Sequence, residues 1–118
     1  MHGLGELESA VMDVLWQASE PLPVRAVLER LDTGRRLAYT TVMTVLDNLH
    51  RKAWVSRAQQ GRAYHYRPEI SREEAAARAV RAVLDSSGNP SAVLMHFVAS
   101  VSDEEGDALR RALRRRRR

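Results

Sequence analysis

Apolar side chains recur every three or four residues through the first half of the chain, which is the spacing of one buried helix face. This pattern predicts helices over residues 6–17, 24–31 and 39–52. Pro21 and Pro23 separate the first two helices, because proline ends one helix and suits the first turn of the next. A polar turn is predicted at residues 32–36. The apolar positions of the three helices are Leu7, Val11, Val14, Leu15, Val24, Val27, Leu28, Leu31, Val42, Val45, Leu46 and Leu49.

The third predicted helix carries a polar stripe beside its apolar one. Its members recur at i, i+3, i+7 and i+10, so they share one side of the helix. Threonine is a mediocre helix former, and surface helices usually carry glutamate, lysine or alanine instead. The stripe is therefore unusual for a merely solvated face. It consists of Thr41, Thr44, Asn48 and Arg51.

The period of the pattern changes from 3.6 to 2 after Lys52. Residues 54–58 and 63–67 alternate as strands do, and the segment between them contains Gly61, which can take a positive φ. We predict a β-hairpin in which Tyr64 and Tyr66 point to one face, and His65 and Arg67 point to the other. Pro68 ends the second strand. We therefore expect two modules, residues 1–68 and residues 69–118.

The second module is predicted to be helical. Residues 71–74 and 102–105 each fit a capping box, Gly88 ends one helix, and Asn89-Pro90 starts the next. Three short helices bury little surface alone, so we expect their apolar faces to pair with a second copy of the chain. The residues expected at this homodimer interface are Val80, Val83, Leu84, Leu94, Phe97, Val98, Val101, Leu109 and Leu113.

Composition narrows the class of protein. The chain has 118 residues, of which 44% are hydrophobic and 29% are charged, as in a small globular protein. It has neither an apolar run of about 18 residues, which a membrane span needs, nor the start of a signal peptide, so we expect a cytoplasmic protein without membrane insertion. The lack of cysteine excludes disulfides, thiolate metal sites and a cysteine nucleophile.

Charge is distributed unevenly along the chain. Residues 1–32 carry −4, residues 33–68 carry +6 and residues 69–118 carry +2. The middle third is expected to attract a polyanion, although an ordinary solvated basic face has the same composition. The arginines at 114–118 either add nonspecific affinity for a polyanion or form a solvated end.

No catalytic motif is present. The four histidines form no HExxH pattern and no i, i+4 pair, and the six glycines form no phosphate-binding loop. We predict that the protein is not an enzyme and binds no metal or cofactor. His65 is expected to be solvated or to face a phosphate, and Trp16 and Trp54 are expected to anchor the core rather than to stack on bases.

The order of the elements is that of a winged helix-turn-helix: two helices, a turn, a polar-striped helix and a basic hairpin. The predicted fold class is therefore mainly α with a small β-hairpin, followed by a C-terminal three-helix dimerisation module. In such a fold the third helix enters the major groove of DNA, and the hairpin lies along the neighbouring backbone. A helical protein–protein adaptor with an incidental basic face is the alternative.

The polar stripe has the chemistry of base recognition. A threonine methyl can touch the thymine methyl, asparagine can pair with adenine, and arginine can reach guanine or phosphate. Arginines on the hairpin supply phosphate contacts that release counterions. The residues predicted to contact double-stranded DNA are Tyr39, Thr40, Thr41, Thr44, Asn48, Arg51, Lys52, Arg57, Arg62 and Arg67.

Residues 39–49, followed by Lys52, Trp54-Val55 and the hairpin at 61–66, resemble the penicillinase and methicillin-resistance repressors of bacteria. The resemblance extends over nearly the whole chain. It implies a homodimeric winged-helix repressor of β-lactamase or β-lactam-response genes that acts on a two-fold operator. It also implies release of the operator when a membrane-bound β-lactam sensor triggers cleavage in the dimerisation helices, where the matching bond is His96–Phe97.

Three features of the sequence depart from the pattern of these repressors. Ala53 stands where they commonly have glycine, at a helix end suited to a left-handed residue. Asp47-Asn48 replaces a commonly basic stretch, and His96 replaces asparagine. The chain also lacks the tail cysteines of the copper-responsive branch, so that branch is set aside.

Overall fold

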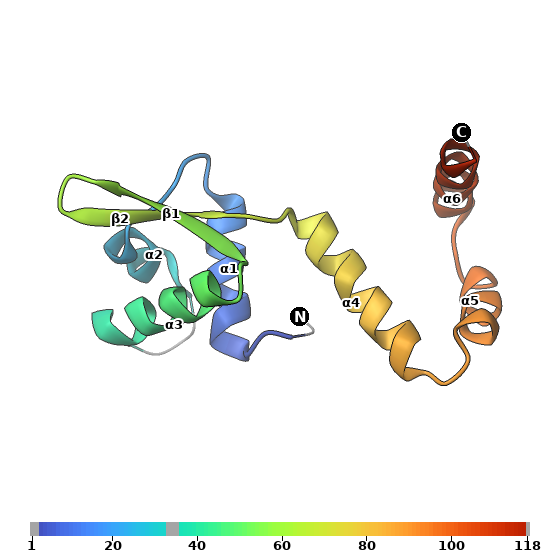
Figure 1. The fold of residues 1–118 in the computed structure, drawn as a ribbon, viewed down its shortest axis with the longest axis horizontal. Helices are drawn as coiled ribbons and strands as arrows, with labels where there is room; N and C mark the ends of the chain where they lie inside the picture. The colour runs from blue at the N-terminus through green and yellow to red at the C-terminus, as the bar shows by residue number, and fades with distance from the viewer. Residues whose placement is uncertain (1–2, 33–35, 118) are drawn as a thin grey trace. The chain divides into compact units, whose positions relative to one another are not determined.

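The computed structural model describes residues 3–32 and 36–117 (Figure 1). Over residues 6–68 its helices and strands agree with the predicted ones to within two residues, and the predicted fold class, mainly α with a small β-hairpin, is confirmed. The predicted turn at residues 32–36 lies largely outside the described residues. In chain order the elements are α1 (Glu6–Gln17), α2 (Val24–Arg30), α3 (Tyr39–Arg51), β1 (Val55–Gln60), β2 (Ala63–Pro68), α4 (Arg72–Ser86), α5 (Pro90–Val98) and α6 (Asp103–Arg116).

The chain divides into two compact units, Met1–Ala79 and Val80–Arg118. The division lies within α4, farther along the chain than the predicted boundary at residues 68–70. Ile70 and Ala75 are the reason, because both are buried in the core of the first unit. No helix in the described part of the chain has both the length and the apolar character that crossing a membrane requires.

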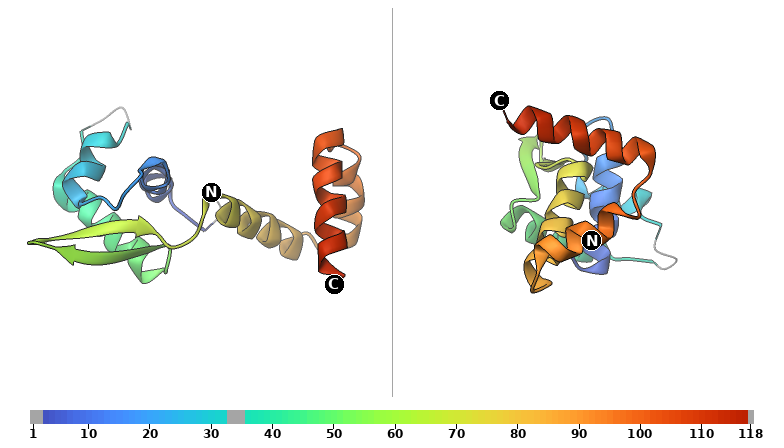
Figure 2. Two further views of the ribbon diagram at one scale, coloured as in Figure 1. Left: turned by 90° about the horizontal axis from the view of Figure 1, so that it is seen from above. Right: turned by 90° about the vertical axis from the view of Figure 1, so that its right-hand side faces the viewer.

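The core of the first unit lies where α1, α2 and α3 meet each other and the hairpin (Figures 1 and 2). Met12, which the predicted apolar stripe omits, is fully buried, whereas Leu7 and Val14 are only partly buried. The reason is that α1 contacts α2, α3 and β2, so it buries a wider arc than one stripe. Trp54 is in this core, and Trp16 packs against it, as predicted.

The hairpin is antiparallel, with Val55 opposite Pro68 and Gln60 opposite Ala63. Gly61 begins its two-residue loop with φ +64°, a left-handed value typical of glycine in such tight turns. Leu22 pairs with the other edge of β2, because its N–H donates to the Tyr66 carbonyl at 2.9 Å and its carbonyl accepts from the Tyr66 N–H at 2.8 Å. Figure 2 shows the hairpin projecting past α3. The extended backbone at Leu22 thus lies beside β2 as a third segment, next to the two strands of the hairpin.

Helix α3 ends in a left-handed turn. The N–H of Ala53 donates to the His50 carbonyl at 3.0 Å, and the N–H of Trp54 donates to the Leu49 carbonyl at 2.9 Å. This is the bond pattern of a Schellman cap, and Ala53 has φ +64°. The left-handed conformation expected at this position is therefore adopted, and an alanine rather than a glycine carries it.

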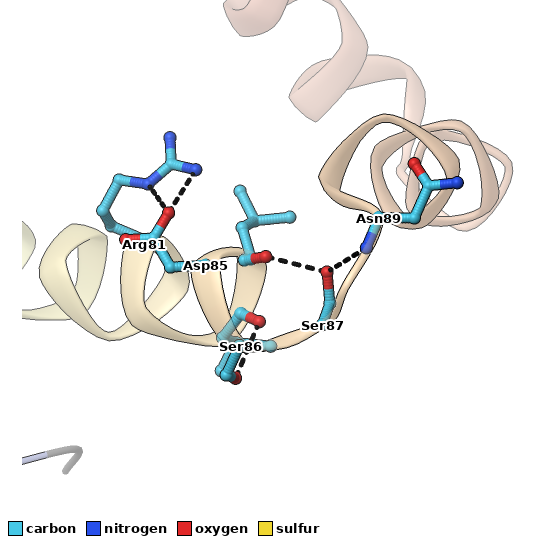
Figure 3. A network of polar contacts seen from close by, with 7 residues as sticks. Arg81, Asp85, Ser86, Ser87 and Asn89 are labelled. Carbon is cyan, nitrogen blue, oxygen red and sulfur yellow. Dashed lines mark hydrogen bonds and ion pairs between the residues drawn. The ribbon is translucent and has the colours of Figure 1, made fainter.

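The second unit is built from the end of α4, α5 and α6, joined by capped turns. Between α4 and α5, Ser87 Oγ donates to the Leu84 carbonyl at 2.7 Å and accepts from Asn89 N at 3.3 Å (Figure 3). Gly88 follows with φ +83°, and Asn89 Oδ1 caps α5 by accepting from Ala92 N at 3.2 Å. The predicted capping box at Ser102 is present at the start of α6.

Candidate nucleic-acid interface

The predicted polar stripe of α3 faces away from the core. Thr41, Thr44 and Arg51 are exposed and Asn48 is partly buried, while the apolar stripe of the same helix is buried. Thr44 Oγ1 donates to the Thr40 carbonyl at 2.9 Å. That bond occupies the hydroxyl proton but leaves the hydroxyl lone pairs and the methyl group available to another molecule.

The first turn of α3 is exposed and has no side-chain cap. Its N-cap residue is Ala38, which makes no side-chain hydrogen bond, and Tyr39 and Thr40 are exposed. The first-turn N–H groups of a helix favour anions unless a side chain caps them. Arg25 of α2 adds a cation here, because its guanidinium carbon lies 5.7 Å from the Tyr39 ring centroid. Arg25 is not among the residues predicted to contact DNA, because it belongs to the acidic first third of the chain.

A groove of about 640 Å³ separates α3 from the hairpin. Tyr39, Met43, Asp47 and His50 follow one another along the helix at helical spacing and form one wall. Only Tyr39 among these four belongs to the predicted DNA-contacting set, although their spacing in the sequence could have revealed the second exposed stripe. The groove is lined by Val24, Tyr39, Met43, Asp47, His50, Arg51, Arg57, Arg62, Ala63, Tyr64 and Tyr66.

Arg57 lies in this groove with contacts to both of its sides. Its Nη1 donates to Asp47 Oδ1 of α3 at 3.2 Å, and its guanidinium carbon lies 4.3 Å from the Tyr64 ring centroid of β2. A hydrogen bond with Tyr66 is the main cause that raises the pKa of Arg57. The side chain is only 27% exposed. Arg57 is therefore the most constrained of the predicted phosphate contacts.

The other arginines predicted to contact DNA differ in whether another side chain binds their guanidinium groups. Arg67 Nε donates to Ser56 Oγ at 3.0 Å, which leaves the rest of its guanidinium exposed. Arg51 and Arg62 are exposed and make no ion pair within the described part of the chain. His65 lies beside the Gln60 side chain, with Nδ1 2.9 Å from Oε1. Arg51 and Arg62 are thus the lining cations with the most freedom to bind an anion.

Lys52 is occupied by a partner on another helix. Its Nζ donates to both oxygens of the Glu8 carboxylate, at 2.9 and 3.1 Å. Partial burial acts to raise the pKa of Glu8, but the Gly5 N–H bond and the Lys52 ammonium outweigh it and lower that pKa. The pair joins the end of α3 to α1, so Lys52 would have to leave Glu8 to reach a phosphate.

No cluster of metal-ligating side chains is present in residues 3–32 and 36–117. Those residues contain no group of three or more histidine, cysteine or carboxylate side chains that could hold an ion.

The second unit exposes large apolar side chains. Leu94, Phe97 and Val98 all lie on α5, and Phe97 is 59% exposed. Leu84 differs from the rest of the predicted interface because it is buried within its own chain, and Val101 is half-buried. The remaining exposed members of the predicted interface are Val80, Val83, Leu109 and Leu113.

The bond between His96 and Phe97 lies in the last turn of α5. His96 is exposed, as is Met95 beside it. The Phe97 carbonyl accepts from Ser100 N at 2.9 Å and from Ser100 Oγ at 2.7 Å. The side chains around this bond are therefore on the surface, while the carbonyl of the next peptide group is hydrogen-bonded.

Comparison with known proteins identifies the family of this chain. The penicillinase repressor family model matches residues 4–115. The chain belongs to the penicillinase repressor family. This confirms the resemblance found in the sequence, and it makes the protein a relative of transcriptional repressors rather than of enzymes.

Two relatives of this penicillinase repressor family protein are informative. The transcriptional regulator BlaI of Mycobacterium tuberculosis is 49% identical over 113 residues, which are 93% of this chain and 82% of that protein. The solution structure of the DNA-binding domain of the repressor BlaI matches with a TM-score of 0.53 and 25% identity, over 61% of this chain and 87% of that one.

A more distant structure supports the fold alone. A mutant of MepR from S. aureus, solved bound to an oligodeoxyribonucleotide, matches with a TM-score of 0.52 and 17% identity, over 95% of this chain and 76% of that one.

Proposed function

We propose that the protein is a cytoplasmic repressor that binds a two-fold DNA operator as a homodimer and represses β-lactamase or β-lactam-response genes. The observation that carries this proposal is the exposed stripe of Thr41, Thr44 and Arg51 on α3, beside a groove that also contains Arg62. This combination places hydrogen-bonding groups next to cations, as base readout beside phosphate binding requires.

The DNA contacts divide into two kinds. Thr41, Thr44 and Asn48 read base edges in the major groove, because hydroxyl, methyl and amide groups distinguish bases there. Tyr39, Thr40 and the first-turn N–H groups of α3 bind a phosphate, as helix starts commonly do. The remaining cations with free donors bind the DNA backbone, and these are Arg51, Arg62 and Arg67.

The homodimer forms through the second unit. Large exposed apolar side chains on α4, α5 and α6 support this proposal, since a soluble protein rarely leaves so many uncovered. A second copy is the simplest cover, because soluble oligomers are mostly symmetric. Two-fold symmetry places two α3 helices on half-sites about 10 base pairs apart, centre to centre.

Release of the operator follows cleavage of the His96–Phe97 bond, triggered by a membrane-bound β-lactam sensor. The resemblance to the methicillin-resistance repressors is the basis for this step. The exposed side chains around the bond support it, although the last turn of α5 must open before a protease can bind the backbone.

A salt titration with a mixed-sequence DNA duplex tests the DNA-binding proposal. A protein with about 6 to 10 phosphate contacts loses roughly a thousandfold or more in affinity between low and moderate salt. We expect a loss of this size for the full chain. Binding that is absent or independent of salt would contradict the repressor and favour the protein–protein adaptor.

A further inference from the structure

Arg57 joins the two walls of the groove. Its side chain extends from β1, donates a hydrogen bond to Asp47 on α3 and stacks on the ring of Tyr64 on β2. The Tyr64 and Tyr66 rings meet edge to face, with centroids 6.5 Å apart, and Tyr66 is buried. The chain of contacts therefore runs from α3 through Arg57 and Tyr64 to a ring fixed in the core.

These contacts disfavour a phosphate at Arg57. The planar guanidinium already contacts the Asp47 carboxylate and the face of the Tyr64 ring, so a phosphate would have to displace one of them. Among the described residues that line the groove, Asp47 alone is an acid, and its charge repels a phosphate that approaches Arg57. Arg62 lies in the hairpin loop and has no such partner in the described part of the chain.

We propose that Arg57 is a positioning residue, which, paired with Asp47 and stacked on Tyr64, sets the width of the groove between α3 and the hairpin. Asp47 then acts as a specificity determinant, because it withholds one cation from the DNA backbone and lowers affinity for DNA of any sequence. This inference rests on the proposed function and refines it, since it separates cations that bind phosphate from one that shapes the site.

The test measures binding of the full chain to a mixed-sequence duplex over a range of salt concentrations. Each phosphate contact that is lost makes the plot of log affinity against log salt shallower by about 1. We expect that loss for Arg62→Ala. For Arg57→Ala we expect weaker binding at every salt concentration with the wild-type slope. A slope that falls as much for Arg57→Ala as for Arg62→Ala would overturn the proposal.

Asp47→Asn provides a second variant that leaves Arg57 in place. Freed from its carboxylate, Arg57 gains a phosphate contact, so the slope becomes steeper by about 1 and nonspecific affinity rises. The double variant Asp47→Asn/Arg57→Ala loses this gain. An unchanged or shallower slope for Asp47→Asn contradicts the proposal, as does a steeper slope that survives in the double variant.

Asp85→Asn is the matched control, because Asp85 is also paired with an arginine, Arg81, at 2.9 Å on exposed α4. We expect it to leave the slope unchanged. If it steepens the slope as Asp47→Asn does, the effect belongs to overall charge and the proposal fails. A wild-type chain whose binding does not depend on salt contradicts the proposed function itself, which distinguishes that failure from failure of the positioning role.

Discussion

The indole Nε1 of Trp16 on α1 donates a hydrogen bond of 2.9 Å to the carbonyl oxygen of Ile70, just before α4. Arg72 reinforces this contact, because its guanidinium carbon lies 5.0 Å from the Trp16 ring and its Nη1 donates to Asp13 at 3.0 Å. The start of α4 is thus fixed to α1, and it belongs to the first unit rather than to the second.

The extent of the first unit can be tested with two fragments. A fragment of residues 1–79 keeps the buried Ile70 and Ala75, whereas a fragment of residues 1–68 loses both. Burial of an isoleucine side chain contributes about 1.5 to 3 kcal/mol, so we expect the longer fragment to be more stable by about 2 kcal/mol. Urea unfolding of both fragments measures the difference. Equal stabilities would place the boundary at Pro68.

Ala53→Gly should stabilise the protein. A residue with a Cβ is strained at φ +64°, and glycine relieves that strain while it adds entropy to the unfolded chain. We expect the free energy of unfolding to rise by about 0.5 to 1 kcal/mol, measured by chemical denaturation. Ala58→Gly is the control, because Ala58 lies in a regular strand, and it should lower the free energy by a similar amount.

Base readout and phosphate binding should respond differently to substitution. Thr44→Ala or Asn48→Ala should reduce the discrimination between operator and random DNA by about 1 to 3 kcal/mol for each base contacted. Arg62→Ala should weaken binding to both DNAs alike. Footprinting on the DNA upstream of the protein's own gene would supply the operator. If Arg62→Ala changed only the discrimination, the assignment of the hairpin to the backbone would be wrong.

Truncation after His96 should abolish repression through loss of the dimer. The truncated chain lacks Phe97, Val98 and all of α6, which carry much of the exposed apolar surface. Two linked DNA-binding units gain about a hundredfold or more in avidity, and a monomer loses this gain. Analytical ultracentrifugation and operator titration measure the two effects. A truncated chain that stays dimeric and binds as tightly would exclude this route of release.

The Glu8–Lys52 pair should make stability depend on acidity. The pKa of Glu8 is lowered in the folded protein, so the pair stabilises the fold at neutral pH, and this contribution is lost as pH falls below about 4. Glu8→Gln should flatten the fall in stability in that acid range. Glu6→Gln is the control, because Glu6 is exposed in the same turn. A Glu8→Gln variant with the wild-type pH profile would contradict the role of this pair.

The local structure could be predicted from the sequence because local signals determine it. Apolar spacing, the prolines and the capping residues Asn89 and Ser102 gave helix bounds that agree with the structure. The alternation after Lys52 likewise predicted the hairpin. The same residues, 39–66, carried the resemblance to the penicillinase repressors, and the family match confirmed it.

Only the tertiary structure decided which of the predicted cations are free. Arg57 and Asp47 are 10 residues apart, Lys52 and Glu8 are 44 apart, and Trp16 and Ile70 are 54 apart. No periodicity relates such positions, because the packing of α1, α3 and the hairpin brings them together. Sequence therefore determined the elements and the family, whereas packing left Arg51 and Arg62 exposed and paired Arg57 with Asp47 and Tyr64.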